Sequence, residues 1–211
     1  MKLTASLKEL ADNSIKRHPG AAQDIMRKAI EDLEATDILK HAVKTGDKFP
    51  DFTLPNAQGK TITLSEQLQK GKVVITFYRG GWCPYCNLEL KAFQEVLPQI
   101  KKKGATLIAI TPETPDNSLS TKEKNELDFE VLTSENNELA RSLNLVFKLP
   151  EALAELYGKF GIDLLESQGN DANELPIAAT YIIDQNGEVS YHFLSEDYKL
   201  RADPEVIIAA L

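Results

Sequence analysis

The chain of 211 residues contains two cysteines, Cys83 and Cys86, which stand three positions apart in the stretch GGWCPYC. Two cysteines placed at random would have this separation about once in a hundred placements. A cysteine thiolate is a nucleophile, and two neighbouring thiols can form and release a disulfide. The spacing therefore indicates a redox-active pair.

The residues before and between the cysteines predict a strand that gives way to a helix. Residues 73–78 read VVITFY, an apolar and β-branched run typical of a buried strand. Gly80 and Gly81 then let the backbone turn sharply. Pro84 suits the first position of a helix, because its missing N–H would have no helical partner there.

This helix start would place Cys83 at the N-cap and Cys86 at the third helical position. Unpaired backbone N–H groups and the positive end of the helix dipole would then lie near both sulfurs and favour thiolate over thiol. A thiol whose pKa falls from about 8.5 to about 6 changes from slightly ionised to almost fully ionised at neutral pH. The same spacing lets the two sulfurs meet in a disulfide without refolding.

Other interpretations of the two cysteines have less support. A zinc site would need two more ligands, and the three histidines, His18, His41 and His192, are scattered along the chain. Inert buried cysteines would not require the glycines, the proline and the helix start. Trp82 and Tyr85 complete the surround of the pair; we expect Trp82 to be a packing residue whose fluorescence can report the redox state.

Composition limits the classes of partner. A net charge of −8 and a pI near 5.0 argue against nucleic acid or anionic membranes as binding partners. The first 20 residues lack the apolar run of a secretory signal, and no stretch approaches the roughly 20 apolar residues of a membrane span. We expect a cytoplasmic protein that needs no metal or organic cofactor.

Strand and helix patterns alternate after residue 45, which predicts an α/β domain with a mixed sheet. We expect strands at 52–54 and 61–64 (a hairpin), 73–78, 105–111, 129–132, and 179–183 with 189–194, the last two joined at an Asn-Gly turn. Expected helices cover 87–100, 136–145, 150–160 and 204–211, and a capping box of Ser120 and Glu123 would open another. The polar stretch 165–174 is expected to be a loop.

Residues 1–45 have a different, helical pattern. Leu3, Leu7 and Leu10 share one helical face, and a second amphipathic pattern at 25–33 follows the break at 18–20. The apolar faces of these helices must pack against another surface, either the main domain or a second subunit. We expect an extension packed on the main domain, with an arm that forms a homodimer as the alternative.

Residues 46–211 resemble the AhpC/TSA peroxiredoxin family, a branch of the thioredoxin fold, and the N-terminal helices resemble the extension of a bacterial subgroup. The family motif FYPxxxTxxC begins at Phe77 and Tyr78, and CNLELKAF continues it, so Cys86 falls on the position that attacks peroxide. Cys83 stands where the family has threonine, and Arg79 where it has proline. The resemblance implies a thioredoxin-like domain at 46–211 with a helical extension at 1–45.

The same stretch is also similar to the WCxxC and CPYC motifs of thioredoxins and glutaredoxins, in which the first cysteine, here Cys83, is the nucleophile. The two templates disagree on the attacking residue. We favour Cys86, because its match continues further downstream.

The family arginine expected before the strand TYIID is absent, since LPIAAT stands there. Arg79 and Arg201 are the candidates for the missing cation, and a surface charge is the alternative for each. We expect Glu89 to be a solvated or capping carboxylate.

The resemblance implies a thiol peroxidase that acts on hydrogen peroxide or an alkyl hydroperoxide. One cysteine would form a sulfenic acid, the other would condense with it to a disulfide, and thioredoxin or a glutathione-linked system would reduce the bridge. A thiol–disulfide oxidoreductase with Cys83 attacking and a non-catalytic redox sensor are the alternatives.

Overall fold

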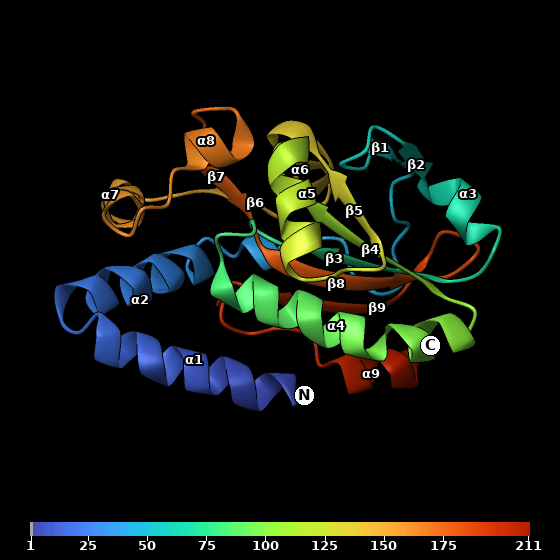
Figure 1. Ribbon diagram of the computed structural model, residues 1–211, viewed down its shortest axis with the longest axis horizontal. Coiled ribbons are helices and arrows are strands. Elements are labelled where there is room, and N and C mark those ends of the chain that lie inside the picture. The colour runs from blue at the N-terminus through green and yellow to red at the C-terminus, as the bar shows by residue number, and fades with distance from the viewer. Residues whose placement is uncertain (1) are drawn as a thin grey trace.

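A mixed sheet of five strands forms the centre of the computed structural model, which describes residues 2–211 (Figure 1). The strand order is β5-β4-β3-β8-β9. Its members are β3 (Val73–Phe77), β4 (Thr106–Thr111), β5 (Glu130–Thr133), β8 (Ala178–Ile183) and β9 (Val189–Ser195). The strands β3, β4 and β5 are parallel, whereas β8 and β9 run antiparallel to their neighbours. The expected α/β class and mixed sheet are confirmed.

The expected hairpins are also present. Strands β8 and β9 are joined by a turn in which Gly187 N–H donates to the Asp184 carbonyl at 2.8 Å. Gly187 has a φ of 79°, a conformation that glycine adopts without steric cost. The shorter strands β1 (Thr53–Pro55) and β2 (Thr61–Thr63) pair antiparallel beside the main sheet.

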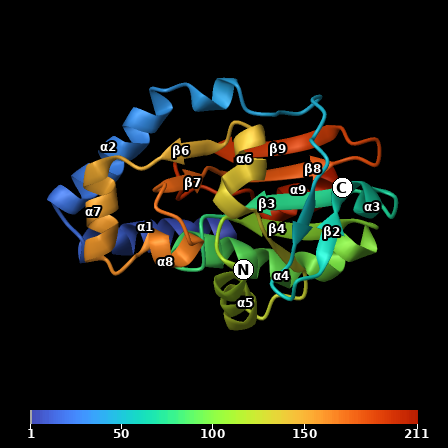
Figure 2. The same cartoon turned by 90° about the horizontal axis from the view of Figure 1, so that it is seen from above.

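Helices cover both faces of the sheet (Figures 1 and 2). On one face lie α1 (Leu3–Arg17), α4 (Pro84–Lys102) and α9 (Pro204–Ala210), whose apolar side chains join one buried cluster. On the other face lie α3 (Leu64–Leu68), the short 3-10 helix η1 (Ile38–Lys40) and α6 (Glu138–Ser142). Strand β3 is buried at every residue and lies between β4 and β8. The residues that follow it therefore leave the sheet near its centre.

Two expectations for the middle of the chain are wrong. Helix α5 (Pro115–Lys124) begins at Pro115 rather than at a capping box, and the Ser120 hydroxyl inside it donates to the Asp116 carbonyl at 3.0 Å. Proline at the first helical position moved the start upstream, because its fixed φ suits that position. The second error concerns Leu64, which opens α3 instead of ending β2.

The stretch 165–174, expected to be a loop, contains most of α8 (Leu164–Gln168) and the first residue of β7 (Glu174–Pro176). The Asp163 side chain caps α8 by accepting from the Glu166 N–H at 3.0 Å, and Gly169, with a φ of 71°, ends it. Strand β7 pairs with β6 (Val146–Lys148). The 3-10 helix η2 (Glu135–Asn137) precedes α6.

The N-terminal helices pack on their own chain. Leu3 and Leu7 of α1 are buried against α4, and Met26 of α2 (Ala21–Glu34) is buried against α7 (Glu151–Lys159). Their location beside the main sheet is visible in Figure 2. A division at residue 46 and a homodimer stay predictions. Among residues 2–211 no helix is both long and apolar enough to cross a membrane.

Replacement of Leu7, which is 6% exposed, tests whether α1 contributes to the stability of the whole chain. Leu7→Ala should lower the free energy of unfolding by roughly 2–5 kcal/mol, because it removes buried methyl groups and leaves a cavity. Urea denaturation measures this. The control is Ile15→Ala on the same helix, where the side chain is 54% exposed. An equal, small effect in both variants would contradict the packing of α1.

Candidate active site

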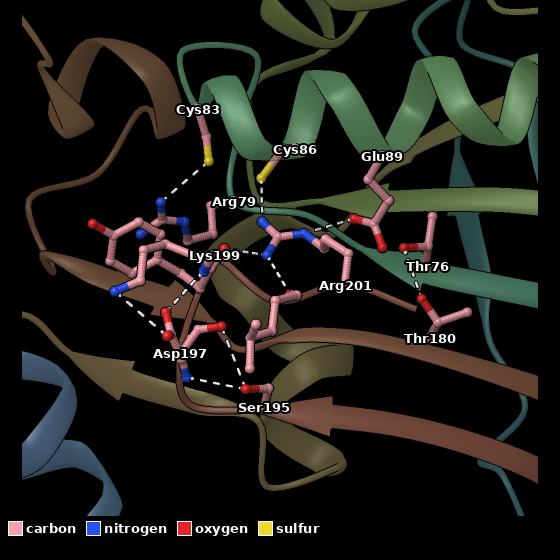
Figure 3. A network of polar contacts seen from close by, with 12 residues as sticks. Thr76, Arg79, Cys83, Cys86, Glu89, Thr180, Ser195, Asp197, Lys199 and Arg201 are labelled. Atoms are coloured by element: carbon pink, nitrogen blue, oxygen red, sulfur yellow. Dashed lines mark hydrogen bonds and ion pairs between the residues drawn. The ribbon is translucent and has the colours of Figure 1, made fainter. Parts of the chain in front are cut away.

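Both cysteines lie at the start of α4, as the sequence predicted. Cys83 is the N-cap residue, with φ −87° and ψ 112°, Pro84 is the first helical residue, and Cys86 follows in the first turn. Both side chains are free thiols and fully buried. Figure 3 shows the two sulfurs pointing from the helix toward two guanidinium groups. The site is therefore a dithiol enclosed by protein.

The two glycines before the cysteines allow close packing. A Cβ on Gly81 would lie 2.0 Å from the Thr121 Oγ1 atom of α5, and a Cβ on Gly80 would lie 2.3 Å from the Trp82 Nε1 atom. Any larger residue would push the loop away from these neighbours. Glycine at position 81 thus lets the cysteine loop pack against α5, and glycine at position 80 leaves room for the Trp82 side chain.

Arg79 contacts the first sulfur. Its Nη2 donates to Cys83 Sγ at 3.1 Å, and its Nη1 donates to the Tyr157 hydroxyl at 2.9 Å. The guanidinium carbon lies 4.2 Å from the centre of the Tyr198 ring and 5.2 Å from that of Trp82. Arg79 is only 3% exposed, so it is a buried cation and not the surface charge considered as the alternative.

Arg201 contacts the second sulfur. Its Nη2 donates to Cys86 Sγ at 3.2 Å, and its Nε forms an ion pair with Glu89 Oε2 at 2.8 Å (Figure 3). Glu89 is 1% exposed, so the expectation of a solvated or capping carboxylate is wrong. A carboxylate can be buried beside Cys86 when a cation pairs with it. The error arose because this cation, Arg201, lies far from Glu89 in the sequence.

The loop between β9 and α9 positions Arg201. The Asp197 N–H donates to the Ser195 hydroxyl at 3.2 Å, and the Asp197 carboxylate accepts from the Lys199 N–H at 3.0 Å. Arg201 Nη1 also donates to the carbonyls of Tyr198 and Leu200. These local bonds bend the loop so that the guanidinium returns toward α4.

The two arginines differ in their own partners. Among residues 2–211 no carboxylate forms an ion pair with Arg79, whereas Arg201 is paired with Glu89. Burial opposes ionisation of Cys83, but its hydrogen bond with Cys86 and the charge of Arg79 outweigh burial and hold the pKa of Cys83 well below its usual value. Burial, and then the hydrogen bond with Cys83, raise the pKa of Cys86. The directions of these two pKa shifts favour ionisation of Cys83 before Cys86.

A second buried carboxylate, Glu113, fixes the loop and was not identified from the sequence. Its Oε2 accepts from the Gly81 N–H at 2.9 Å, and its Oε1 accepts from the Ser167 hydroxyl at 3.1 Å. Burial raises the pKa of Glu113 to about 7. The available signal was its place just after β4, because the carboxyl ends of parallel neighbours such as β3 and β4 meet at one edge.

A cavity of about 280 Å³ has Arg79 in its lining. Trp82, Pro84 and Tyr85 line it together with Tyr157 and residues of the N-terminal helices. The Trp82 and Tyr157 rings meet edge to face with centres 5.5 Å apart. The packing role expected for Trp82 is thus present at the cavity wall. No group of three His, Cys, Asp or Glu side chains within the described chain could hold a metal ion.

Glu113→Gln tests the effect of this carboxyl on stability. Between pH about 4.3 and about 7 the group is ionised in the unfolded chain but protonated in the folded one, so its contribution to the free energy of unfolding falls as pH rises. Relative to the wild type, the variant should gain stability through this window by up to about 1.4 kcal/mol per pH unit. Urea denaturation at several pH values measures it. Glu123→Gln at an exposed position is the control, and the same pH trend in both would contradict the assignment.

Comparison with known proteins shows which family the chain resembles. Residues 45–192 match the AhpC/TSA family. Peroxiredoxin Q, chloroplastic, of Gentiana triflora is 30% identical over 148 residues, covering 70% of this chain and 57% of the relative, so the chain spans about three fifths of that protein. Peroxiredoxin Bcp of Escherichia coli (strain K12) is 22% identical over 79% of this chain and 94% of its own length.

Among solved structures, peroxidoxin BcpB from Mycobacterium tuberculosis superposes with a TM-score of 0.63 at 21% identity, covering 80% of this chain and 96% of that one. The Plasmodium vivax 2-Cys peroxiredoxin gives 0.60 at 15% identity, covering 79% and 93%. These likenesses confirm the thioredoxin-like fold expected from the sequence. The chain belongs to the AhpC/TSA family.

Proposed function

We propose that the chain is a thiol-dependent peroxidase that reduces hydrogen peroxide or an organic hydroperoxide through Cys83 and Cys86. The observation that carries the proposal is the pair of buried free thiols at a helix start, each in contact with a buried guanidinium. Membership of the AhpC/TSA family and the peroxiredoxin relatives support it.

The chemistry needs only the two sulfurs and a proton. A thiolate attacks the oxygen of the peroxide that carries the hydrogen, the S–O bond forms, and the O–O bond breaks. The leaving oxygen takes the bonding electrons and a proton, and departs as water or an alcohol. The second thiol then attacks the sulfenic acid, so that an S–S bond forms, the S–O bond breaks and water leaves.

Charge development in the first step explains the need for arginine. Negative charge moves onto the leaving oxygen, and fixed donors aimed at that oxygen lower the barrier. The Arg79 guanidinium lies next to Cys83, and its other amino group donates to the Tyr157 hydroxyl. A guanidinium cannot lose its proton at neutral pH, so it supplies this stabilisation without a proton transfer of its own.

The two orders of attack have different support. The resemblance to the peroxiredoxin motif favours Cys86, which has Arg201 and Glu89 beside it. The charge distribution favours Cys83, because the neighbouring Arg79 is not neutralised by a carboxylate and borders the cavity. We assign the first attack to Cys83 and the second to Cys86. Both orders give the same disulfide and the same products.

The burial of both thiols favours a peroxide over a protein disulfide as the oxidising substrate. A protein disulfide must bring its own backbone to within bonding distance of a sulfur, and both sulfurs are fully covered. An external dithiol, thioredoxin or a glutathione-linked system, would reduce the bridge after the first turn of α4 opens. This cycle fits the cytoplasmic location expected from the sequence.

Rapid mixing of reduced protein with one equivalent of hydrogen peroxide tests the function. The fluorescence of Trp82, the single tryptophan, follows oxidation, and a sulfenic acid trap with mass spectrometry locates the product. We expect fast oxidation that is kept in Cys86→Ser, with the trap on Cys83, and lost in Cys83→Ser. The reverse pattern would move the first attack to Cys86. Oxidation no faster than that of a free thiol would overturn the function in favour of disulfide exchange.

Arg79→Met should slow the reaction with hydrogen peroxide about a hundredfold, because removal of one donor to a developing oxyanion has this order of effect. The measurement is the second-order rate constant in the same instrument. Arg27→Met is the control, since Arg27 lies on α2 and pairs with exposed Asp24 and Glu31. Similar rates in Arg79→Met and the wild type would remove Arg79 from the reaction.

A further inference from the structure

The cavity beside Arg79 is larger than hydrogen peroxide requires. We propose that it binds the organic part of an aryl hydroperoxide, a single substituted ring bearing the –OOH group, and that the N-terminal helices select this substrate. The inference rests on the proposed peroxidase function and names the substrate class of the same site.

The size of the cavity sets the first limit. Its volume is about 280 Å³. A dry apolar cavity of about 150 Å³ is known to bind benzene, and drug-sized ligands occupy roughly 300–1,000 Å³. One ring with a small branched substituent therefore fits, whereas a long acyl chain or a peptide does not.

Most of the cavity lining is apolar or aromatic, and Ser14, Arg17 and His18 are its polar members in addition to Arg79. The apolar part includes Leu10 of α1, Met26 of α2, and Phe160 and Ile162 after α7. The Tyr198 ring forms another part of the wall and meets Met26, since the Tyr198 hydroxyl donates to Met26 Sδ at 3.5 Å. Aromatic rings pack well against thioether and aromatic groups of this kind.

At Arg79 the cavity lining carries polar groups next to a thiol. Arg79 lines the cavity and contacts Cys83 Sγ at 3.1 Å. Within the described residues, two buried donors of the lining have no hydrogen-bond partner, Arg79 Nε and Trp82 Nε1. A buried unpaired N–H costs free energy, and a bound oxygen would satisfy it. A ligand with an apolar ring and a polar –OOH group therefore matches both the apolar part of the lining and the unpaired donors at Arg79 and Trp82.

Orientation of the ligand follows from these contacts. With the ring among Leu10, Met26 and Phe160, the –OOH group lies at Arg79, whose Nη2 contacts Cys83 Sγ; Cys83 itself is buried behind the lining and not part of it. The Cys83 thiolate takes the terminal oxygen and becomes the sulfenic acid, while the O–O electrons and a proton go to the oxygen that remains on the organic group. The product is the corresponding alcohol, which then leaves the cavity.

Helix α1 offers a matched pair of positions for the test. Ser14 is half-buried and lines the cavity, whereas the adjacent Ile15 is 54% exposed and outside it. Ser14→Phe should fill the cavity, and Ile15→Phe places the same ring in solvent. Initial rates with thioredoxin and its reductase give kcat/KM for cumene hydroperoxide and for hydrogen peroxide.

We expect the ratio of kcat/KM for cumene hydroperoxide to that for hydrogen peroxide to fall at least tenfold in Ser14→Phe and to keep its wild-type value in Ile15→Phe. Ile162→Phe, which fills the cavity from the opposite wall, should lower the ratio as well and serves if Ser14→Phe does not fold. Ratios unchanged in both cavity variants would overturn the inference while leaving the peroxidase function intact.

Binding of the alcohol product separates the two proposals. 2-Phenyl-2-propanol should change Trp82 fluorescence in the wild type, with at least tenfold weaker binding in Ser14→Phe. Turnover of peroxide without this binding would overturn the inference alone. No turnover of either peroxide by the wild type would overturn the proposed function, and with it the assignment of the cavity to a hydroperoxide.

Discussion

The contact of two buried guanidiniums with two buried sulfurs is the constraint on which the rest of the structure depends. Each arginine is almost fully buried, and a buried charge is tolerated only when partners surround it. Arg79 has Cys83, the Tyr157 hydroxyl and two aromatic rings; Arg201 has Cys86 and Glu89. Burial raises the pKa of Glu89 to about 8, although the charge of Arg201 opposes this shift. Among residues 2–211 no carboxylate forms an ion pair with Arg79, so the Cys83 thiolate is the anion that faces this guanidinium. The thiolate is therefore part of the electrostatic balance of the fold as well as the reactive group.

Distant parts of the chain meet around this cluster. Helix α4 supplies Glu89 and both sulfurs, the loop after β9 supplies Arg201, and Glu113 after β4 holds the glycine loop. The N-terminal helices add the outer wall of the neighbouring cavity. A site of this kind has few interchangeable parts. Removal of one member of a buried charge pair leaves the other unpaired, which costs more than the pair itself contributes.

The sequence predicted those features that local rules control. Gly80, Gly81 and Pro84 fix the turn and the helix start, so the positions of the cysteines followed directly, as did the buried strands. Glu89 was misassigned because nothing near it in the sequence shows that Arg201, more than a hundred residues later, reaches the same interior. Tyr157 and Tyr198 gave no signal, since an aromatic residue on a helix face or in a loop reads as packing. The helix within 165–174 was missed because its cap, Asp163, lies before the polar stretch.

The arrangement of charges has a consequence for the oxidised protein. When the sulfurs join, the cluster loses the anion of Cys83, while Arg79 keeps its charge, because a guanidinium does not lose its proton at neutral pH. The positive charge of Arg79 then faces no anion, which raises the free energy of the bridged form relative to the dithiol. The redox couple is displaced toward a more oxidising potential, because the reduced state is the one stabilised.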